Sequence, residues 1–127
     1  MNRKYKILIV EDEESLRFVY SEYLASEGFE VLQAEDGEKA LELVNENKDL
    51  DMILLDLMIP KIDGIKVLEK LKSDSATKNI KVYLMTVLAK DTTIEKAFDI
   101  GSDGYLIKDT LTPEQIKTEI LAVLEGK

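Results

Sequence analysis

Carboxylate, hydroxyl and ammonium groups follow the apolar runs of this chain at the points where each run ends. The first run is followed by consecutive acids, and three later runs end in an aspartate, a threonine and a lysine. The groups are Glu11, Asp12, Glu13, Glu14, Asp56, Thr86 and Lys108. If these positions meet in space, they offer oxygen ligands for a hard divalent cation, one nucleophilic carboxylate and one fixed positive charge.

Bringing several carboxylates together is unfavourable unless a cation accompanies them. Two like charges ~4 Å apart repel by roughly 4 kcal/mol at an effective dielectric constant near 20. Mg²⁺ relieves such repulsion, and it typically takes one or two carboxylates and keeps several waters. A carboxylate can also attack phosphorus and form an aspartyl phosphate, a reaction that needs mainly positioning and charge neutralisation. The residue types therefore indicate a metal-assisted phosphoryl site.

Composition excludes several other chemistries. The chain of 127 residues contains no His and no Cys, so imidazole catalysis, disulfides and zinc–thiolate sites are absent. Its net charge of −9 argues against direct binding to nucleic acid or to an anionic membrane, because both require basic patches. No apolar run approaches the roughly 20 residues of a membrane helix, and the N-terminal run ends in acids, unlike a signal peptide. We expect one cytoplasmic domain over residues 1–127.

Apolar patterning predicts five strands that alternate with helices. The strand-like runs are Lys6–Val10, Phe29–Ala34, Asp51–Asp56, Ile80–Thr86 and Asp103–Lys108. Helical stripes, which we expect to be buried in the core, lie between and after them: Leu16, Val19, Tyr20, Tyr23 and Leu24; Ala40, Leu41 and Val44; Ile65, Leu68 and Leu71; Ile94, Ala97 and Phe98; Ile116, Ile120, Val123 and Leu124. This order predicts an α/β fold with a doubly wound parallel sheet. Ligands of such sheets bind at the carboxyl ends of the strands, where the polar groups lie.

Residues at the expected helix ends agree with this assignment. Gly28 and Gly101 stand where helices should terminate. Asp36 and Asp63 are candidate N-caps. The stretch from Thr112 to Gln115 combines an N-cap, a proline in the first turn and a capping-box glutamine.

The segments ILIVEDEE, LLDLMIPKIDG and LMT, followed by a strand that ends in lysine, resemble the receiver domains of two-component response regulators, including chemotaxis regulators. The resemblance covers essentially the whole chain. It implies a flavodoxin-like (βα)₅ fold with strand order 2-1-3-4-5. It also implies a signalling switch that catalyses only its own phosphorylation and dephosphorylation, and that does not turn over a separate substrate as an enzyme does.

The same resemblance implies a role for each site residue. Asp56 would accept the phosphoryl group, and Thr86 and Lys108 would contact its oxygens. Mg²⁺ or Mn²⁺ would be bound by Glu11, Asp12, Asp56 and the backbone carbonyl of Met58. Tyr105 matches the aromatic residue whose rotation is coupled to the threonine. The implied partners are a histidine kinase or histidine phosphotransfer protein and a downstream effector protein or domain.

Four features depart from the family pattern. Lys108 is followed by Asp109, where the family usually has a cis-proline, and a cis bond to another residue type costs roughly 2.5–4 kcal/mol. Glu11 replaces a common Asp. Val87 is larger than the usual Ala or Gly. Met58 and Leu88 are apolar where faster members carry polar groups that position the hydrolytic water. This predicts slow loss of the phosphoryl group.

Three alternatives remain open at this stage. A pseudo-receiver would have the same fold and act as an interaction module without phosphorylation. A phosphatase similar to the haloacid dehalogenase family would use an Asp-x-Asp pair, but Asp56-Leu57-Met58 lacks the second Asp. A flavin-binding module of the same topology would need a phosphate-cradling loop after the first strand, where this chain has four acids.

Overall fold

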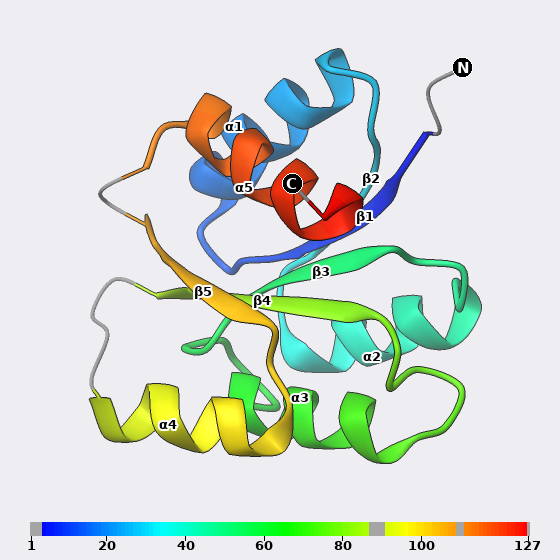
Figure 1. Cartoon of the computed structure of the whole chain (residues 1–127), viewed down its shortest axis with the longest axis vertical. Helices are drawn as coiled ribbons and strands as arrows, with labels where there is room; N and C mark the ends of the chain where they lie inside the picture. Colours follow the sequence, from blue (N-terminus) through cyan, green and yellow to red (C-terminus); the bar gives the residue numbers. More distant parts are fainter. Residues whose placement is uncertain (1–3, 87–90, 109–110, 127) are drawn as a thin grey trace.

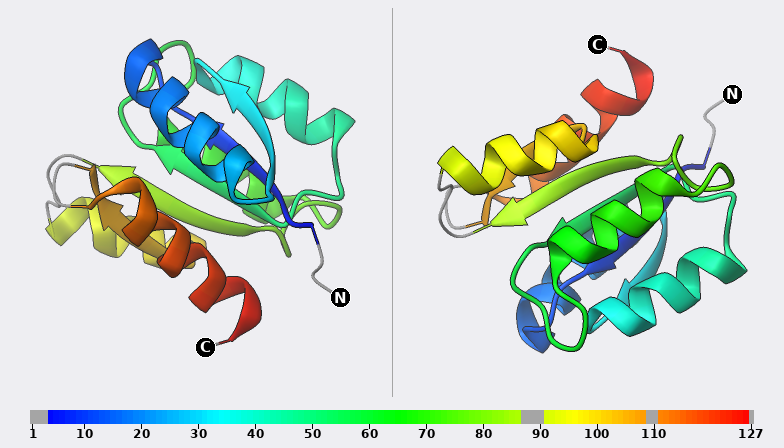
Figure 2. Two further views of the ribbon diagram at one scale, coloured as in Figure 1. Left: turned by 90° about the horizontal axis from the view of Figure 1, so that it is seen from above. Right: turned by 90° about the horizontal axis from the view of Figure 1, so that it is seen from below.

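The computed structural model describes residues 4–86, 91–108 and 111–126. Its elements alternate as predicted: β1 (Lys6–Val10), α1 (Glu14–Ser26), β2 (Glu30–Ala34), α2 (Gly37–Glu46), β3 (Met52–Asp56), α3 (Gly64–Ser73), β4 (Lys81–Thr86), α4 (Asp91–Ile100), β5 (Gly104–Ile107) and α5 (Pro113–Glu125). The strands form one parallel sheet in the order β2-β1-β3-β4-β5. This is the predicted flavodoxin-like fold. Helices α1 and α5 cover one face of the sheet, and α2, α3 and α4 cover the other (Figures 1 and 2).

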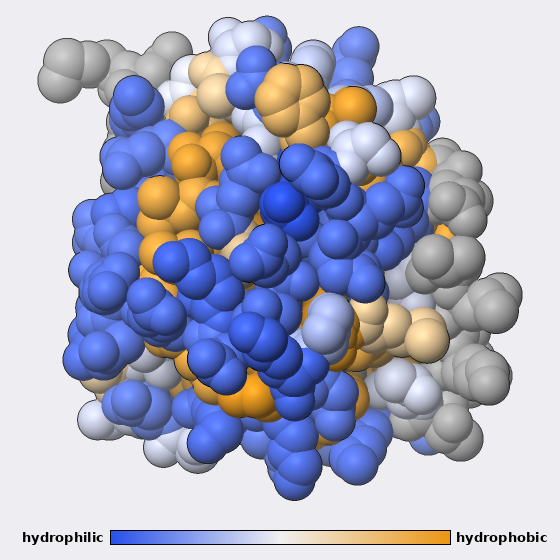
Figure 3. Space-filling model, turned by 180° about the vertical axis from the view of Figure 1, so that it is seen from behind, coloured by the Kyte–Doolittle hydropathy of each residue, from blue (hydrophilic) through white to orange (hydrophobic). Residues whose placement is uncertain are grey.

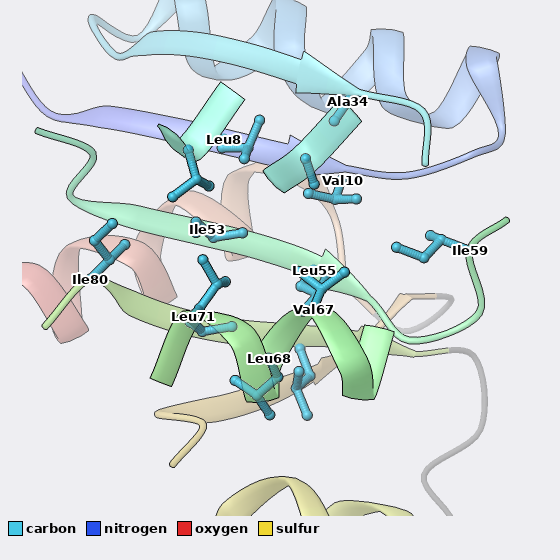
Figure 4. Packing of buried hydrophobic residues seen from close by; sticks show 14 of the residues in the cluster. Leu8, Val10, Ala34, Ile53, Leu55, Ile59, Val67, Leu68, Leu71 and Ile80 are labelled. Atoms are coloured by element: carbon cyan, nitrogen blue, oxygen red, sulfur yellow. The ribbon is translucent and has the colours of Figure 1, made fainter. Parts of the chain in front are cut away.

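Each face of the sheet has its own apolar core, because successive strand residues point to opposite faces. In β1, Leu8 and Val10 pack toward α2 and α3, whereas Ile7 and Ile9 pack toward α1 and α5. Figure 4 shows the first of these cores, in which Leu68 and other α3 side chains lie against the strands. All of β3 is buried. This burial explains why the central strands lack an alternating polar pattern.

The helix ends match the predicted caps. The side chains of Asp36 and Asp63 accept hydrogen bonds from the backbone N–H groups of Lys39 and Lys66. Thr112 and Gln115 form the predicted reciprocal capping box at the start of α5. Gly28 and Gly101 follow α1 and α4 with φ angles of 97° and 124°.

Several details of the sequence prediction were wrong. Val19 and Phe98, which we placed on buried helix faces, are 49% and 46% exposed. The second strand begins at Glu30 and not at Phe29, because the Phe29 N–H still donates to the carbonyl of Leu24 at the end of α1. The fifth strand likewise ends at Ile107, so Lys108 lies just beyond it.

The surface agrees with the acidic composition of the chain. Seen from behind, the molecule is covered mainly by hydrophilic residues, and its hydrophobic patches are small and separated (Figure 3). Among the residues that the structure describes, no helix is both long and apolar enough to cross a bilayer.

Candidate phosphoryl-transfer site

Four strands deliver the predicted site residues to one edge of the sheet. Glu11 follows β1, Asp56 ends β3, Thr86 ends β4 and Lys108 follows β5. Because all the strands are parallel, these carboxyl ends point the same way, toward the left in Figure 1. The complete set of residues therefore meets only when β1, β3, β4 and β5 have paired.

The acids form a compact group. Carboxylate oxygens of Glu11, Asp12 and Asp56 all lie within 4.8 Å of one another. Glu11 is fully buried and Asp56 is 4% exposed, whereas Asp12 is exposed. Three clustered carboxylates, two of them screened from water, make the strong negative potential that favours a cation.

Lys108 supplies one positive charge to this group. Its Nζ donates a hydrogen bond to Oδ2 of Asp56 at 2.8 Å. The same nitrogen lies 2.5 Å from Oε1 of Glu11. That contact is a buried ion pair. Lys108 therefore bridges two buried acids.

Local backbone contacts fix the two buried carboxylates. The N–H of Met58 donates to Oδ1 of Asp56 at 3.0 Å, and the N–H of Glu13 donates to Oε2 of Glu11 at 3.0 Å. Each acid is thus held by an amide two residues further along the chain and, on its other oxygen, by Lys108. The side chains are oriented toward each other before any ligand arrives.

At both Glu11 and Lys108, burial and the contacts with neighbouring charges act on the pKa in opposite directions. Burial raises the pKa of Glu11 above its ordinary value, and the contacts with Lys108 and the Glu13 amide offset only part of this effect. Burial alone would lower the pKa of Lys108, but the hydrogen bonds and charges of Asp56 and Glu11 outweigh it and raise that pKa. Lys108 therefore stays charged at neutral pH.

Thr86 and Tyr105 lie on neighbouring strands. Thr86 is buried beside the acids at the end of β4. Tyr105 is paired with Leu84, two residues before Thr86, so both side chains point toward the same face of the sheet. The Tyr105 ring is 42% exposed and makes an edge-on contact with Phe98 of α4, with ring centroids 6.4 Å apart. Tyr105 is therefore a partly exposed ring that packs against α4.

Sequence reasoning missed two supporting residues. Nη1 of Arg17 donates to the backbone carbonyl of Glu11 at 2.8 Å, and the hydroxyl of Tyr20 donates to the carbonyl of Lys108 at 3.5 Å. Both come from α1, where the spacing indicated only a helix face. No sequence signal distinguishes such contacts, because they depend on how α1 packs against the sheet. The predicted effects of Asp109, Val87 and Leu88 fall on residues outside those that the structure describes.

The donors at this edge fit a magnesium ion. They are carboxylate oxygens of three clustered acids, and Mg²⁺ prefers such oxygen ligands. Met58 lies in the loop directly after Asp56, which is compatible with the predicted carbonyl ligand. Its side chain is 82% exposed and therefore does not pack over Asp56.

The fold and the acidic edge together define a doubly wound α/β domain with a candidate phosphoryl site, and comparison with known proteins identifies its family. The family model for the response regulator receiver domain matches residues 7–121. The chain therefore belongs to the receiver domains of two-component systems. Domains of this family function as signalling switches.

Individual relatives agree with this assignment. The chain is 36% identical over 119 residues to the transcriptional regulatory protein SrrA of Staphylococcus aureus, covering 94% of this chain but 47% of that protein. The chemotaxis protein CheY4 of Vibrio cholerae has a similar structure, with a TM-score of 0.89 and 26% identity over 96% of this chain and all of that one. A CheY-like receiver domain protein of Methanospirillum hungatei gives a TM-score of 0.88 at 25% identity, over 98% of this chain and 96% of that one.

Proposed function

We propose that this chain is a phosphoacceptor domain in which Asp56 receives a phosphoryl group from the phosphohistidine of a histidine kinase or histidine phosphotransfer protein. The observation that carries the proposal is the hydrogen bond of 2.8 Å from Lys108 to Asp56 within a group of three carboxylates. A buried nucleophile, a fixed cation and oxygen ligands for a metal are the groups that phosphoryl transfer needs.

In the proposed reaction a carboxylate oxygen of Asp56 attacks phosphorus in line. The new O–P bond forms as the P–N bond of phosphohistidine breaks, and its electron pair returns to the imidazole nitrogen. Lys108 neutralises charge on the phosphoryl oxygens, and Thr86 donates a hydrogen bond to one of them. Glu11, Asp12, Asp56 and the Met58 carbonyl would hold Mg²⁺, or Mn²⁺ in its place, which supplies further neutralisation of the developing negative charge.

The proposed output is a change of interaction surface. Thr86 moves toward the phosphoryl group, and Tyr105 leaves its exposed position against Phe98. The surface around α4, β5 and α5 then favours a downstream effector protein or domain. The domain itself contacts neither nucleic acid nor membrane, in keeping with its net charge of −9. We place it in the cytoplasm, together with the kinase domain that would phosphorylate it.

Mass spectrometry after incubation with acetyl phosphate and Mg²⁺ tests the acceptor directly. The wild-type chain should gain one phosphoryl group, and Asp56→Asn should gain none. Asp12→Asn keeps the acceptor and removes a proposed metal ligand, so it should be modified more slowly and require more Mg²⁺. A folded wild-type chain that neither binds Mg²⁺ nor gains mass would instead be a pseudo-receiver.

A further inference from the structure

The loop of residues 57–63, which joins Asp56 to α3, contains an unusual tight turn. The N–H of Ile62 donates to the carbonyl of Pro60 at 2.9 Å, and Lys61 between them has a φ angle of 69°. A three-residue turn closed by such a bond around a positive φ is rare and strained. Strained backbone of this kind persists only where the surroundings hold it in place.

The first residues of α2 provide one such hold. The N–H of Gly37 donates to the carbonyl of Pro60 at 3.3 Å. Gly37 is also in close contact with the turn, because a Cβ atom added to it would lie only 2.1 Å from the carbonyl oxygen of Ile62. Only a residue without a side chain fits between α2 and this loop.

Asp36 adds a second contact from the same helix end. One of its carboxylate oxygens caps α2 by accepting from the Lys39 N–H at 2.7 Å, and the other lies 3.5 Å from Nζ of Lys61. A single side chain thereby connects the start of α2 to the strained residue of the loop.

The other end of the loop is held by α3. The N–H of Gly64 donates to the carbonyl of Leu57 at 3.1 Å, and a Cβ atom on Gly64 would lie 2.5 Å from Cα of Leu57. Met58 lies between these two sets of contacts, and its exposed side chain makes little packing contact of its own. The position of the Met58 backbone is therefore determined by contacts of its neighbours.

We propose that Asp36 and Gly37 are positioning residues for the loop 57–63 and, through it, for the Met58 backbone beside Asp56. The inference rests on the proposed function in one respect, because it gives the Met58 carbonyl a part in Mg²⁺ binding. Neither residue belongs to the group of acids Glu11, Asp12 and Asp56. They act by holding the turn at Lys61, which sets the direction in which the chain leaves Asp56.

Gly37→Ala tests the steric part of this proposal, with Glu38→Ala as the matched control at the next, exposed position of α2. Calorimetric titration should show Mg²⁺ affinity about tenfold lower in Gly37→Ala, the loss typical of disturbing groups behind a metal ligand. Glu38→Ala should bind as the wild type does. Alanine is a better helix former than glycine, so an effect confined to α2 would stabilise the helix and leave Mg²⁺ affinity unchanged.

Asp36→Asn tests the electrostatic part and remains informative if Gly37→Ala does not fold. Asparagine keeps the helix cap but loses the charge that faces Lys61. Because the Lys61 side chain is 57% exposed, the expected loss of Mg²⁺ affinity is smaller, about two- to threefold. Hydrogen exchange of the Ile62 amide in metal-free protein should become faster in both variants.

Wild-type exchange at Ile62 together with wild-type Mg²⁺ affinity in the folded variants would overturn the positioning role. Failure of the proposed function has a different signature. If wild-type protein gains no phosphoryl group from acetyl phosphate, but Ile62 exchanges faster in Asp36→Asn, the acceptor assignment is wrong and the positioning role stands.

Discussion

Nζ of Lys108 lies 2.8 Å from Oδ2 of Asp56 and 2.5 Å from Oε1 of Glu11, so one ammonium is shared by two buried acids. The lysine follows the edge strand β5, and the acids come from the two central strands β1 and β3. This bridge partly neutralises the acidic cluster in the absence of metal. If Mg²⁺ binds as proposed, it would share these carboxylates with Lys108.

Replacing Lys108 with alanine should destabilise the metal-free domain strongly. Two buried carboxylates would lose their counter-ion, and removing one partner of a buried ion pair typically costs about 3–5 kcal/mol. Lys117→Ala is the matched control, because Lys117 pairs with Glu27 in a more exposed setting where the cost is about 0–1 kcal/mol. Urea unfolding in the presence of a chelator measures both, and equal losses would contradict a buried bridge.

Glu11→Gln should stabilise the metal-free domain at neutral pH. Burial raises the pKa of Glu11 in the folded state above the ordinary value of 4.5, so the folded state favours the protonated form. The resulting stabilisation is fully present below pH 4.5 and is lost as pH rises through the folded-state pKa. The ionised acid is therefore unfavourable at neutral pH, and glutamine removes that cost.

Chemical unfolding from about pH 4 to about pH 8 measures this dependence. The gain from Glu11→Gln should be largest at the upper end and disappear toward the lower end. Glu14→Gln, at an exposed acid in the first turn of α1, should show no such gain. A constant difference across the range would mean that the effect of Glu11 is not a titration.

Met58→Asn should shorten the lifetime of the phosphorylated state. The wild-type methionine offers no hydrogen bond to an attacking water, and its side chain is exposed next to Asp56. One added hydrogen bond of about 1 kcal/mol in the transition state corresponds to roughly fivefold faster hydrolysis. Loss of the phosphoryl group can be followed by mass spectrometry after acetyl phosphate is removed. Met58→Leu, which adds no polar group, should keep the slow wild-type rate.

Thr86→Ala should separate phosphorylation from the response of Tyr105. The variant keeps Asp56 and Lys108, so it should still gain a phosphoryl group. The Tyr105 ring resonances should shift on phosphorylation in the wild-type chain and shift much less in the variant, because the threonine hydroxyl is absent. Thr118→Ala on α5 serves as the control. An unchanged Tyr105 response in Thr86→Ala would show that the ring is not coupled through this residue.

The fold was predictable because its signals are local. The apolar runs, the caps at Asp36, Asp63 and Thr112, and the order of elements are all present in short stretches of sequence. The exposure of Val19 and Phe98 was not predictable in this way. Helical spacing marks a face but does not say how much of it neighbouring elements cover, and both side chains lie at the margin.

The same distinction between local signals and three-dimensional packing applies to the candidate site. Strand-end positions brought Glu11, Asp56 and Lys108 to one edge as expected, since parallel strands share a direction. The sharing of Lys108 by two acids depends on side-chain geometry across three strands. The contact of Asp36 with Lys61 depends on a loop path, and nothing in the spacing of these residues indicates it.

The strand order also affects how the chain reaches this structure. β1 and β3 pair at the centre of the sheet, whereas β5 joins at the edge after the chain has passed through β4. If the central strands paired while β5 was undocked, Glu11 and Asp56 would lie together without Lys108. Docking of β5 would bring Lys108 to the two acids and relieve their repulsion. The charges of the site therefore couple β5, the last strand along the chain, to β1, the first.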